Sequence, residues 1–395
     1  MIRLRAAVVL PLALVVALFA VRASIFESPA DHPLRQLQSS FASHPAALID
    51  SAMRDIGSAA SKSQAMPASA EHAMLQAARK APLAPEPFLV GGTMAQMAGD
   101  DGGAEAMFMA ARLRNPRAPA ARYFLADRFL RTNRIAAGLD EMAALAKLSE
   151  HAATPFAPAL AAYARSPGAI PQLRRFFAGA PATRDMTLEL LSQDPANTEL
   201  VLALAPPLPL HQSPSPSWPA ILVQGLVTAH NYGPAEALWQ RINGVERRGL
   251  LYDPQFRDQS AAPPFNWRLS SGSAGVAEAS GAGGLDIIYY GREETVFAAQ
   301  MIRLDPGSYR LAMRVEAPVS ASGMAWFVTC AAGDSQGLLQ LPLEAAQKGV
   351  LAAGFTVPAG NCPVQWIALR GKPGDSSDTA QVTISDLALN AAPAR

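Results

Sequence analysis

The chain has 395 residues, more than the roughly 100 to 200 of one ordinary domain, so we expect at least two folded units. Half of the residues are hydrophobic and 16% are charged, which excludes wholesale disorder. The 33 basic and 32 acidic residues leave a formal charge of +1. This small charge provides no field that would gather phosphates, so we do not expect nucleic acid as a partner.

The first 25 residues have the pattern of a membrane segment. Arg3 and Arg5 precede an uncharged apolar run over residues 6–21, and Arg22 follows it. A helix over this run is about 24 Å long, slightly short of the roughly 30 Å hydrocarbon core, so flanking arginines would have to reach the interface. We predict a single-pass anchor in the inner membrane, with the bulk of the chain in the periplasm. The alternative is a cleaved signal peptide, which would leave a periplasmic or secreted protein.

Residues 26–250 have the alternation of apolar stretches and short turns that is typical of an α-helical region. The clearest part is a helix over 135–148, whose apolar residues recur at spacings of three and four. The turn 132–134 joins it to a preceding helix over 120–131. We therefore expect the two to pack as an antiparallel hairpin.

The hairpin recurs along the chain. Pro87-Phe88, Ala121-Arg122 and Pro155-Phe156 begin successive predicted helices at intervals of 34 residues. Thirty-four residues is the period of tetratricopeptide (TPR) repeats, which this part of the chain resembles, although Arg122 departs from the usual residue and 166–205 fits no repeat. The alternative is an irregular helical bundle. Stacked repeats form an extended surface that binds proteins, so the resemblance implies a protein partner.

Two stretches rich in proline separate the predicted parts. Six prolines lie within residues 206–219, and we interpret residues 205–219 as a spacer between helical units, because proline has no backbone donor and favours extended chain. Residues 251–263 are predicted to be a linker. After this linker the period of the apolar residues changes from three or four to two.

Residues 264–395 have the pattern of an antiparallel β-sandwich. Tyr309, Leu311, Met313 and Val315 alternate with more polar residues, as in a strand with one buried face. Seven to nine such strands, with no intervening helix, indicate two packed antiparallel sheets. The expected strands cover 265–269, 285–290, 295–304, 309–315, 325–330, 350–357, 364–370 and 380–389.

The order of short phrases in this part resembles the jelly roll of galactose-binding-like carbohydrate-binding modules. The phrases are FNWRL, IYYGREE, LDPGSYRLAMRV, FTVPAGNCPVQWIALRG and VTISDLAL. Helical repeats followed by such a sandwich resemble exported accessory proteins of bacterial exopolysaccharide systems. The resemblance implies a multidomain α plus β protein whose sandwich binds polysaccharide or another envelope protein.

Glycan binding requires exposed aromatic rings, because the C–H faces of sugars stack on them. Tyr289, Tyr290 and Arg292 are our candidates for this role. Neighbouring residues on a strand point to opposite faces, so one of the two tyrosines must point outward or towards a second sheet.

Cys330 and Cys362 are the only cysteines, and an exported compartment permits a disulfide between them. The alternative is two buried free thiols. Alternation along the strands places Trp326 on the face of Cys330 and Trp366 on that of Cys362. A disulfide would therefore place both tryptophans in the core.

No sequence signature of catalysis, metal binding or a cofactor is present. The six histidines are scattered without metal-ligand spacing, and G-x-S-x-G, H-E-x-x-H and P-loop motifs do not occur. Glu293 and Glu294 are adjacent, so in extended chain they face opposite ways and cannot flank one glycosidic bond. We predict a non-catalytic scaffold or assembly factor of the cell envelope. The alternatives are a carbohydrate-active enzyme and a glycan-binding adhesin.

Overall fold

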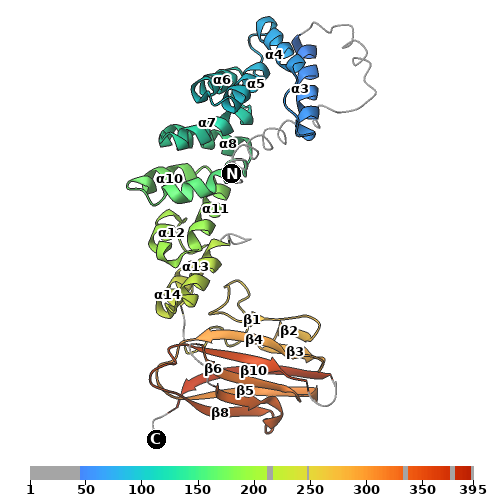
Figure 1. The fold of residues 1–395 in the computed structure, drawn as a ribbon. Coiled ribbons are helices and arrows are strands. Elements are labelled where there is room, and N and C mark those ends of the chain that lie inside the picture. The colour runs from blue at the N-terminus through green and yellow to red at the C-terminus, as the bar shows by residue number, and fades with distance from the viewer. Residues whose placement is uncertain (1–44, 211–216, 247–248, 332–336, 374–378, 393–395) are drawn as a thin grey trace. The chain divides into compact units, whose positions relative to one another are not determined.

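The computed structural model of the protein describes residues 45–210, 217–246, 249–331, 337–373 and 379–392 (Figure 1). It is an α plus β structure with a helical N-terminal half and an antiparallel two-sheet β-sandwich at the C-terminus. The chain divides into two compact units, residues 1–187 and 188–395. Within the described residues, no helix has both the length and the apolar character needed to cross a membrane. The predicted membrane segment over residues 1–25 lies outside them.

The described part of unit 1, residues 45–187, consists of consecutive helices, several of which pack as hairpins. The helices are α3 (Pro45–Ser61), α4 (Ala68–Lys80), α5 (Glu86–Met97), α6 (Asp101–Arg114), α7 (Pro119–Arg131), α8 (Ile135–Leu148), η1 (Thr154–Phe156), α9 (Ala157–Tyr163), α10 (Ala169–Phe177) and the first part of α11 (Pro181–Ser192). Helix α3 packs on α4, α5 on α6, and α7 on α8. The predicted hairpin over 120–148 is thus confirmed as α7 and α8, and the starts of α6 and α8, Asp101 and Ile135, are 34 residues apart.

Small residues let the helices of unit 1 approach closely. Gly92 of α5 lies against Phe108 of α6, so that a Cβ at position 92 would be 2.8 Å from two atoms of the Phe108 ring. The Phe108 ring stacks in turn on Phe124 of α7, with 3.9 Å between the ring centroids. Buried residues from three consecutive helices therefore form one core, as stacked hairpins require.

Unit 2 begins with helices that the sequence analysis assigned to the repeat region. They are the end of α11, η2 (Pro195–Asn197), α12 (Thr198–Leu204), α13 (Trp218–Thr228) and α14 (Tyr232–Asn243). The predicted spacer over 205–219 lies partly outside the described residues, and its last two residues, Trp218 and Pro219, are buried in the first turn of α13. Proline is well suited to the first turn of a helix, where its missing N–H has no intrahelical partner in any case.

The sandwich consists of two sheets of five strands each (Figure 1). The first sheet has the order β1-β4-β9-β6-β7 and the second β2-β3-β10-β5-β8, with antiparallel neighbours throughout. The strands are β1 (Arg268–Leu269), β2 (Gly275–Ala279), β3 (Leu285–Tyr289), β4 (Thr295–Ile302), β5 (Gly307–Ser320), β6 (Met324–Cys330), β7 (Gly337–Pro342), β8 (Val350–Val357), β9 (Gln365–Gly371) and β10 (Ala380–Ala391), and η3 (Leu343–Ala345) follows β7.

Residues 251–263 pack against the sandwich, which differs from the free linker expected from the sequence. Leu251 and Phe256 belong to the hydrophobic core between the two sheets. The buried side-chain amide of Gln300 on β4 accepts from the backbone N–H of Tyr252 at 3.2 Å and donates to its carbonyl at 2.9 Å. This stretch lacks regular structure but has apolar residues to bury, and it is part of the β unit.

Candidate functional site

The structure does not bring the predicted glycan-binding residues Tyr289, Tyr290 and Arg292 together on one surface. Tyr289, at the end of β3, is 1% exposed, and its ring packs edge-on against Phe297 at 5.5 Å. Tyr290 is half-buried after β3, and Arg292 is exposed in the following turn. The assignment of Tyr289 to a glycan platform was wrong, because its ring is enclosed between the sheets and no sugar can stack on it.

The surroundings of the Tyr289 hydroxyl agree with this core position. The hydroxyl donates to the carbonyl of Glu293 at 3.1 Å. Burial raises the pKa of Tyr289 above its usual value, and the negative charges of Glu294 and Glu293 raise the pKa further. Tyr289 therefore remains neutral and serves as a structural residue.

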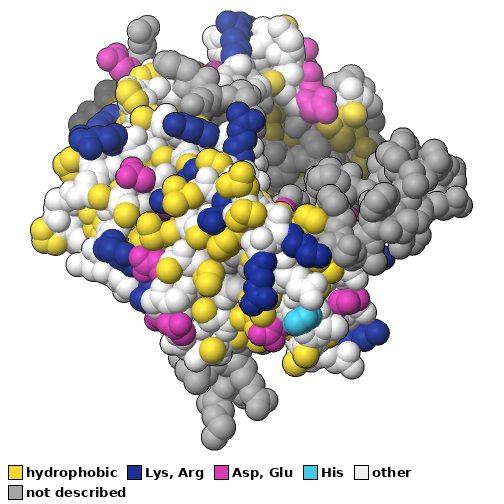
Figure 2. Space-filling view, turned by 90° about the horizontal axis from the view of Figure 1, so that it is seen from above, with side chains coloured by type: hydrophobic (Ala, Val, Ile, Leu, Met, Phe, Trp, Pro, Cys, Tyr) yellow, Lys and Arg dark blue, Asp and Glu magenta, His cyan; other side chains and the backbone are white. Residues whose placement is uncertain are grey.

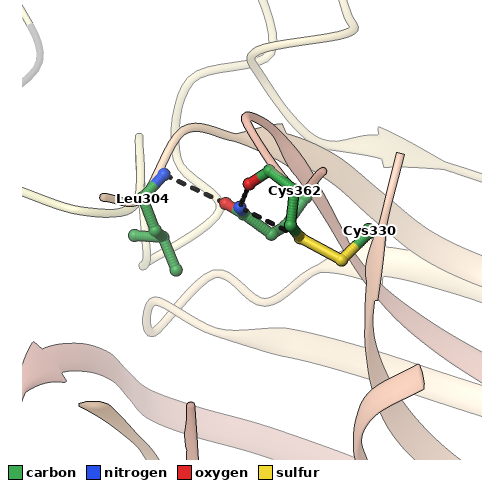
Figure 3. The surroundings of a disulfide bond; sticks show 4 residues. Leu304, Cys330 and Cys362 are labelled. Carbon is green, nitrogen blue, oxygen red and sulfur yellow. Dashed lines mark hydrogen bonds between the residues drawn. A yellow bond between two sulfur atoms is a disulfide. The ribbon is translucent and has the colours of Figure 1, made fainter. Parts of the chain in front are cut away.

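The structure joins Cys330 and Cys362 in a disulfide, one of the two states that the sequence left open (Figure 3). Cys330 ends β6, whereas Cys362 lies in the loop before β9. Both cysteines are buried. The disulfide thus fastens this loop to the edge of the core.

The buried side chain of Gln365 holds the same loop by hydrogen bonds (Figure 3). Its amide nitrogen donates to the carbonyl of Cys362 at 2.6 Å, and its amide oxygen accepts from the backbone N–H of Leu304 at 3.0 Å. The Gln365 side chain therefore ties the loop of Cys362 to the backbone at Leu304.

The two tryptophans expected on one face point to opposite faces. Trp326 of β6 is fully buried between the sheets, whereas Trp366 of β9 is half-buried and is not part of the core between the sheets. The prediction that both lie in the core was wrong for Trp366. The prediction required the alternation between faces to continue from Cys362 through Pro363. However, β9 begins only at Gln365, and side chains alternate between faces only within a strand.

The outward face of the first sheet carries a row of side chains that crosses all five strands. Because directly paired residues of antiparallel strands point to the same face, the register gives this row as Arg268, Ala299, Ala368, Phe327 and Gln340. Four steps between strands span about 19 Å. The row therefore runs across the strands for a length that several linked sugar units would occupy.

Larger side chains lie on both sides of the small residues in this row. Trp366 and Arg370 are each two residues from Ala368 on β9, so they share its face and leave the alanine between them. The guanidinium of Arg370 lies over the ring of Phe327, with its Cζ 5.1 Å from the ring centroid. We call the seven residues of the row and its flanks the outer strip: Arg268, Ala299, Phe327, Gln340, Trp366, Ala368 and Arg370.

The outer strip differs from the outward face of the second sheet. The exposed residues on the strands of that sheet include Arg310, Arg314 and Glu316 of β5 and Asp286 of β3, as expected of a solvated face. The outer strip instead presents two half-buried aromatic rings from adjacent strands, with a guanidinium and an amide beside them. This is the combination of apolar platform and polar groups that sugar recognition requires.

The described residues contain no group of three or more His, Cys, Asp or Glu side chains that could hold a metal ion. Two acidic residues on the second sheet, Asp286 and Asp386, each contact a side chain of the protein. Asp286 accepts from the Thr383 hydroxyl at 2.7 Å, and Asp386 pairs with Arg314 at 3.1 Å.

Comparison with known proteins finds solved structures that are similar in fold to the β part of the chain. No protein-family profile and no curated protein matches the sequence. Three solved structures of carbohydrate-binding modules match the C-terminal β part. A family 4 module is 14% identical, with 36% of this chain and 99% of the module covered and a TM-score of 0.29. A family 61 module in complex with β-1,4-galactotriose is 17% identical (37% and 100% covered, TM-score 0.25), and a family 16 module is 13% identical (36% and 99% covered, TM-score 0.26). Matches of this extent assign no ligand to this chain.

Proposed function

We propose that the outer strip binds a polysaccharide chain and that the protein is a non-catalytic scaffold or assembly factor of the cell envelope. The observation that supports the proposal most is the pair of aromatic rings, Trp366 and Phe327, half-exposed on the same outward face of adjacent strands. Both rings are on the face of the sheet that points away from the second sheet, and sugar C–H faces are suitable partners for the exposed part of such rings.

Replacing Trp366 with alanine is expected to weaken polysaccharide binding by about 10-fold or more, since truncation of a central aromatic contact commonly costs roughly 2 kcal/mol. Binding is measured as depletion of the intact chain by insoluble polysaccharides and by titration with soluble xylan, galactan and polygalacturonate. The Trp366→Phe variant keeps a ring and should retain most of the affinity.

Tyr290→Ala is the matched control for this prediction. Tyr290 is also a half-buried aromatic residue, but it follows β3 of the second sheet and is not part of the outer strip. We expect its replacement to leave binding unchanged. If Tyr290→Ala weakens binding as much as Trp366→Ala does, or if no polysaccharide binds saturably, the outer strip is not a glycan site.

The helical unit is proposed to bind a protein partner, as TPR-like repeats do. Unit 1 exposes large apolar side chains, among them Leu75, Leu83 and Leu113, which are 55%, 81% and 73% exposed. Arg114 donates to the carbonyl of Pro82 at 2.6 Å and so holds the loop of Leu83 beside α6, which carries Leu113. Figure 2 shows one face of the molecule on which apolar side chains lie between those of lysine and arginine. A photocrosslinker at position 83 that labels no protein in the envelope fraction would remove this part of the proposal.

We place the protein in the periplasm, attached to the inner membrane through residues 1–25. A disulfide between Cys330 and Cys362 supports an oxidising compartment. The alternative function, a carbohydrate-active enzyme of the exopolysaccharide system, would release reducing sugar from the polysaccharide that the outer strip binds. An end-group assay with the intact chain distinguishes the two.

A further inference from the structure

We infer that the outer strip selects a polysaccharide that carries carboxylate groups, such as a polymer of uronic acid. This inference rests on the proposed function, because it specifies the chemical class of glycan that the same site takes. Its basis is the distribution of charged side chains between the two sheets.

The five strands of the first sheet contain only two charged residues, Arg268 and Arg370, and both are basic. The register places both on the outward face. The strands of the second sheet contain two basic and four acidic residues, all of them exposed: Arg310, Arg314, Glu278, Asp286, Glu316 and Asp386. The first sheet therefore presents a positive outward face, whereas the second presents a mixed face with an excess of acid.

The two arginines are placed where a carboxylate on a bound chain would reach them. Arg268 lies opposite Ala299 at one end of the row, and Arg370 lies beside Ala368 near its middle. The two alanines have the smallest side chains of the row and are themselves only 3% and 4% exposed, so a sugar chain would rest on the larger side chains around them and pass between the two guanidinium groups. An arginine offers a planar pair of donors that matches the two oxygens of a carboxylate.

Neither arginine forms an ion pair with a carboxylate in the part of the chain that the structure describes. Arg370 instead lies over the Phe327 ring, and its Nε is buried without a hydrogen-bond partner among the described residues. Stacking on the ring restricts the orientation of the guanidinium while its charge remains unneutralised by these residues. Glu294 and Lys372 lie just beyond the last pair of β4 and β9, Thr295 and Gly371, and their opposite charges leave the strip positive.

The test compares polygalacturonate with the same polymer after complete methyl esterification, which removes the negative charge and keeps the sugar backbone. The intact chain should bind the acid form at least about 10-fold more tightly at low salt, because one charge-assisted contact is worth roughly 1.5 to 3 kcal/mol. The difference should shrink as sodium chloride screens the charges. In a variant with both Arg268→Gln and Arg370→Gln, the preference for the acid form should disappear.

The matched control replaces Arg310 and Arg314 with glutamine on the second sheet, which removes the same formal charge from another surface. We expect it to keep the preference for the acid form. If the two double variants lose the preference equally, the effect is one of net charge, and the inference is overturned.

Two other outcomes distinguish this inference from the proposed function. Equal binding of the acid and ester forms, both abolished by Trp366→Ala, would overturn the anionic preference and leave polysaccharide binding in place. Absence of saturable binding to every polysaccharide would remove both. Urea unfolding of each variant, followed by tryptophan fluorescence, shows whether the sandwich is still folded.

Discussion

Replacing Glu141 with alanine is expected to lower the free energy of unfolding of unit 1 by about 3 kcal/mol. The Glu141 side chain on α8 is 4% exposed and forms ion pairs with Arg112 of α6 and with Arg122 of α7, the latter at 2.6 Å. It therefore joins three consecutive helices. Removing the carboxylate leaves two partly buried guanidinium groups without their partner, which costs more than the loss of an exposed ion pair.

The effect can be measured in unit 1 separately from unit 2. All five tryptophans lie in unit 2, at positions 218, 239, 267, 326 and 366, so tryptophan fluorescence reports on that unit alone. Far-ultraviolet circular dichroism during urea unfolding should show the Glu141→Ala shift in the helical signal, while the fluorescence transition stays in place. The Asp127→Ala variant is the control, since Asp127 pairs with Arg131 in a bridge whose side chains are each 51% exposed, and we expect a change below about 0.5 kcal/mol. Equal shifts in Glu141→Ala and Asp127→Ala would contradict the prediction.

The same carboxylate is the partner of Arg122, the position at which the sequence departs from the TPR pattern that it resembles. A repeat of this type usually has a small or aromatic residue at that position, but in this chain the position faces Glu141 across the α7–α8 hairpin. The two residues are 19 apart in the sequence, and their pairing depends on how the helices pack, so the sequence pattern alone did not show it. The ends of a helix, by contrast, depend mainly on residues near them in the sequence. The helix predicted over 135–148 accordingly agrees with α8, Ile135–Leu148.

The two strands that the sequence analysis did not predict, β2 and β7, have weak local signals. β2 has the sequence GVAEA, with two alanines and a glycine, and β7 has GLLQLP, which ends in proline. Neither is rich in the β-branched and aromatic residues that favour strands, and both lie at sheet edges. The stretch 350–357, which contains two valines, a phenylalanine and a threonine, was predicted with the observed ends of β8.

The candidate site could be predicted only as a set of residue types. Trp366 was expected in the core, and the outward face that it shares with Phe327 follows from the pairing of β6 with β9. Pro363 and Val364 lie in irregular chain before β9. The alternation between faces is therefore not continuous from Cys362 to Trp366, and Trp366 points outward although a count from Cys362 predicts the core.

Removing the disulfide is expected to lower the free energy of unfolding of unit 2 by about 3 to 4 kcal/mol. Cys330 and Cys362 are 32 residues apart, so the bond closes a long loop and restricts the unfolded chain, which makes unfolding less favourable. Tryptophan fluorescence during urea unfolding should show a lower midpoint for the Cys330→Ala, Cys362→Ala double variant and for the reduced wild-type chain. The helical signal of unit 1 should change little.

The double variant also provides the control for the reductant. Dithiothreitol should lower the midpoint of the wild-type chain but leave that of the double variant unchanged, because the chain contains no other cysteine. Alkylation followed by mass measurement should find no free thiol in the denatured oxidised chain and two after reduction. Two reactive thiols in the protein purified without reductant would contradict both the disulfide and the stabilisation argued from it. Phe327 lies on β6 and Trp366 on β9. Loss of the disulfide should therefore also weaken polysaccharide binding at urea concentrations that unfold a measurable fraction of the sandwich.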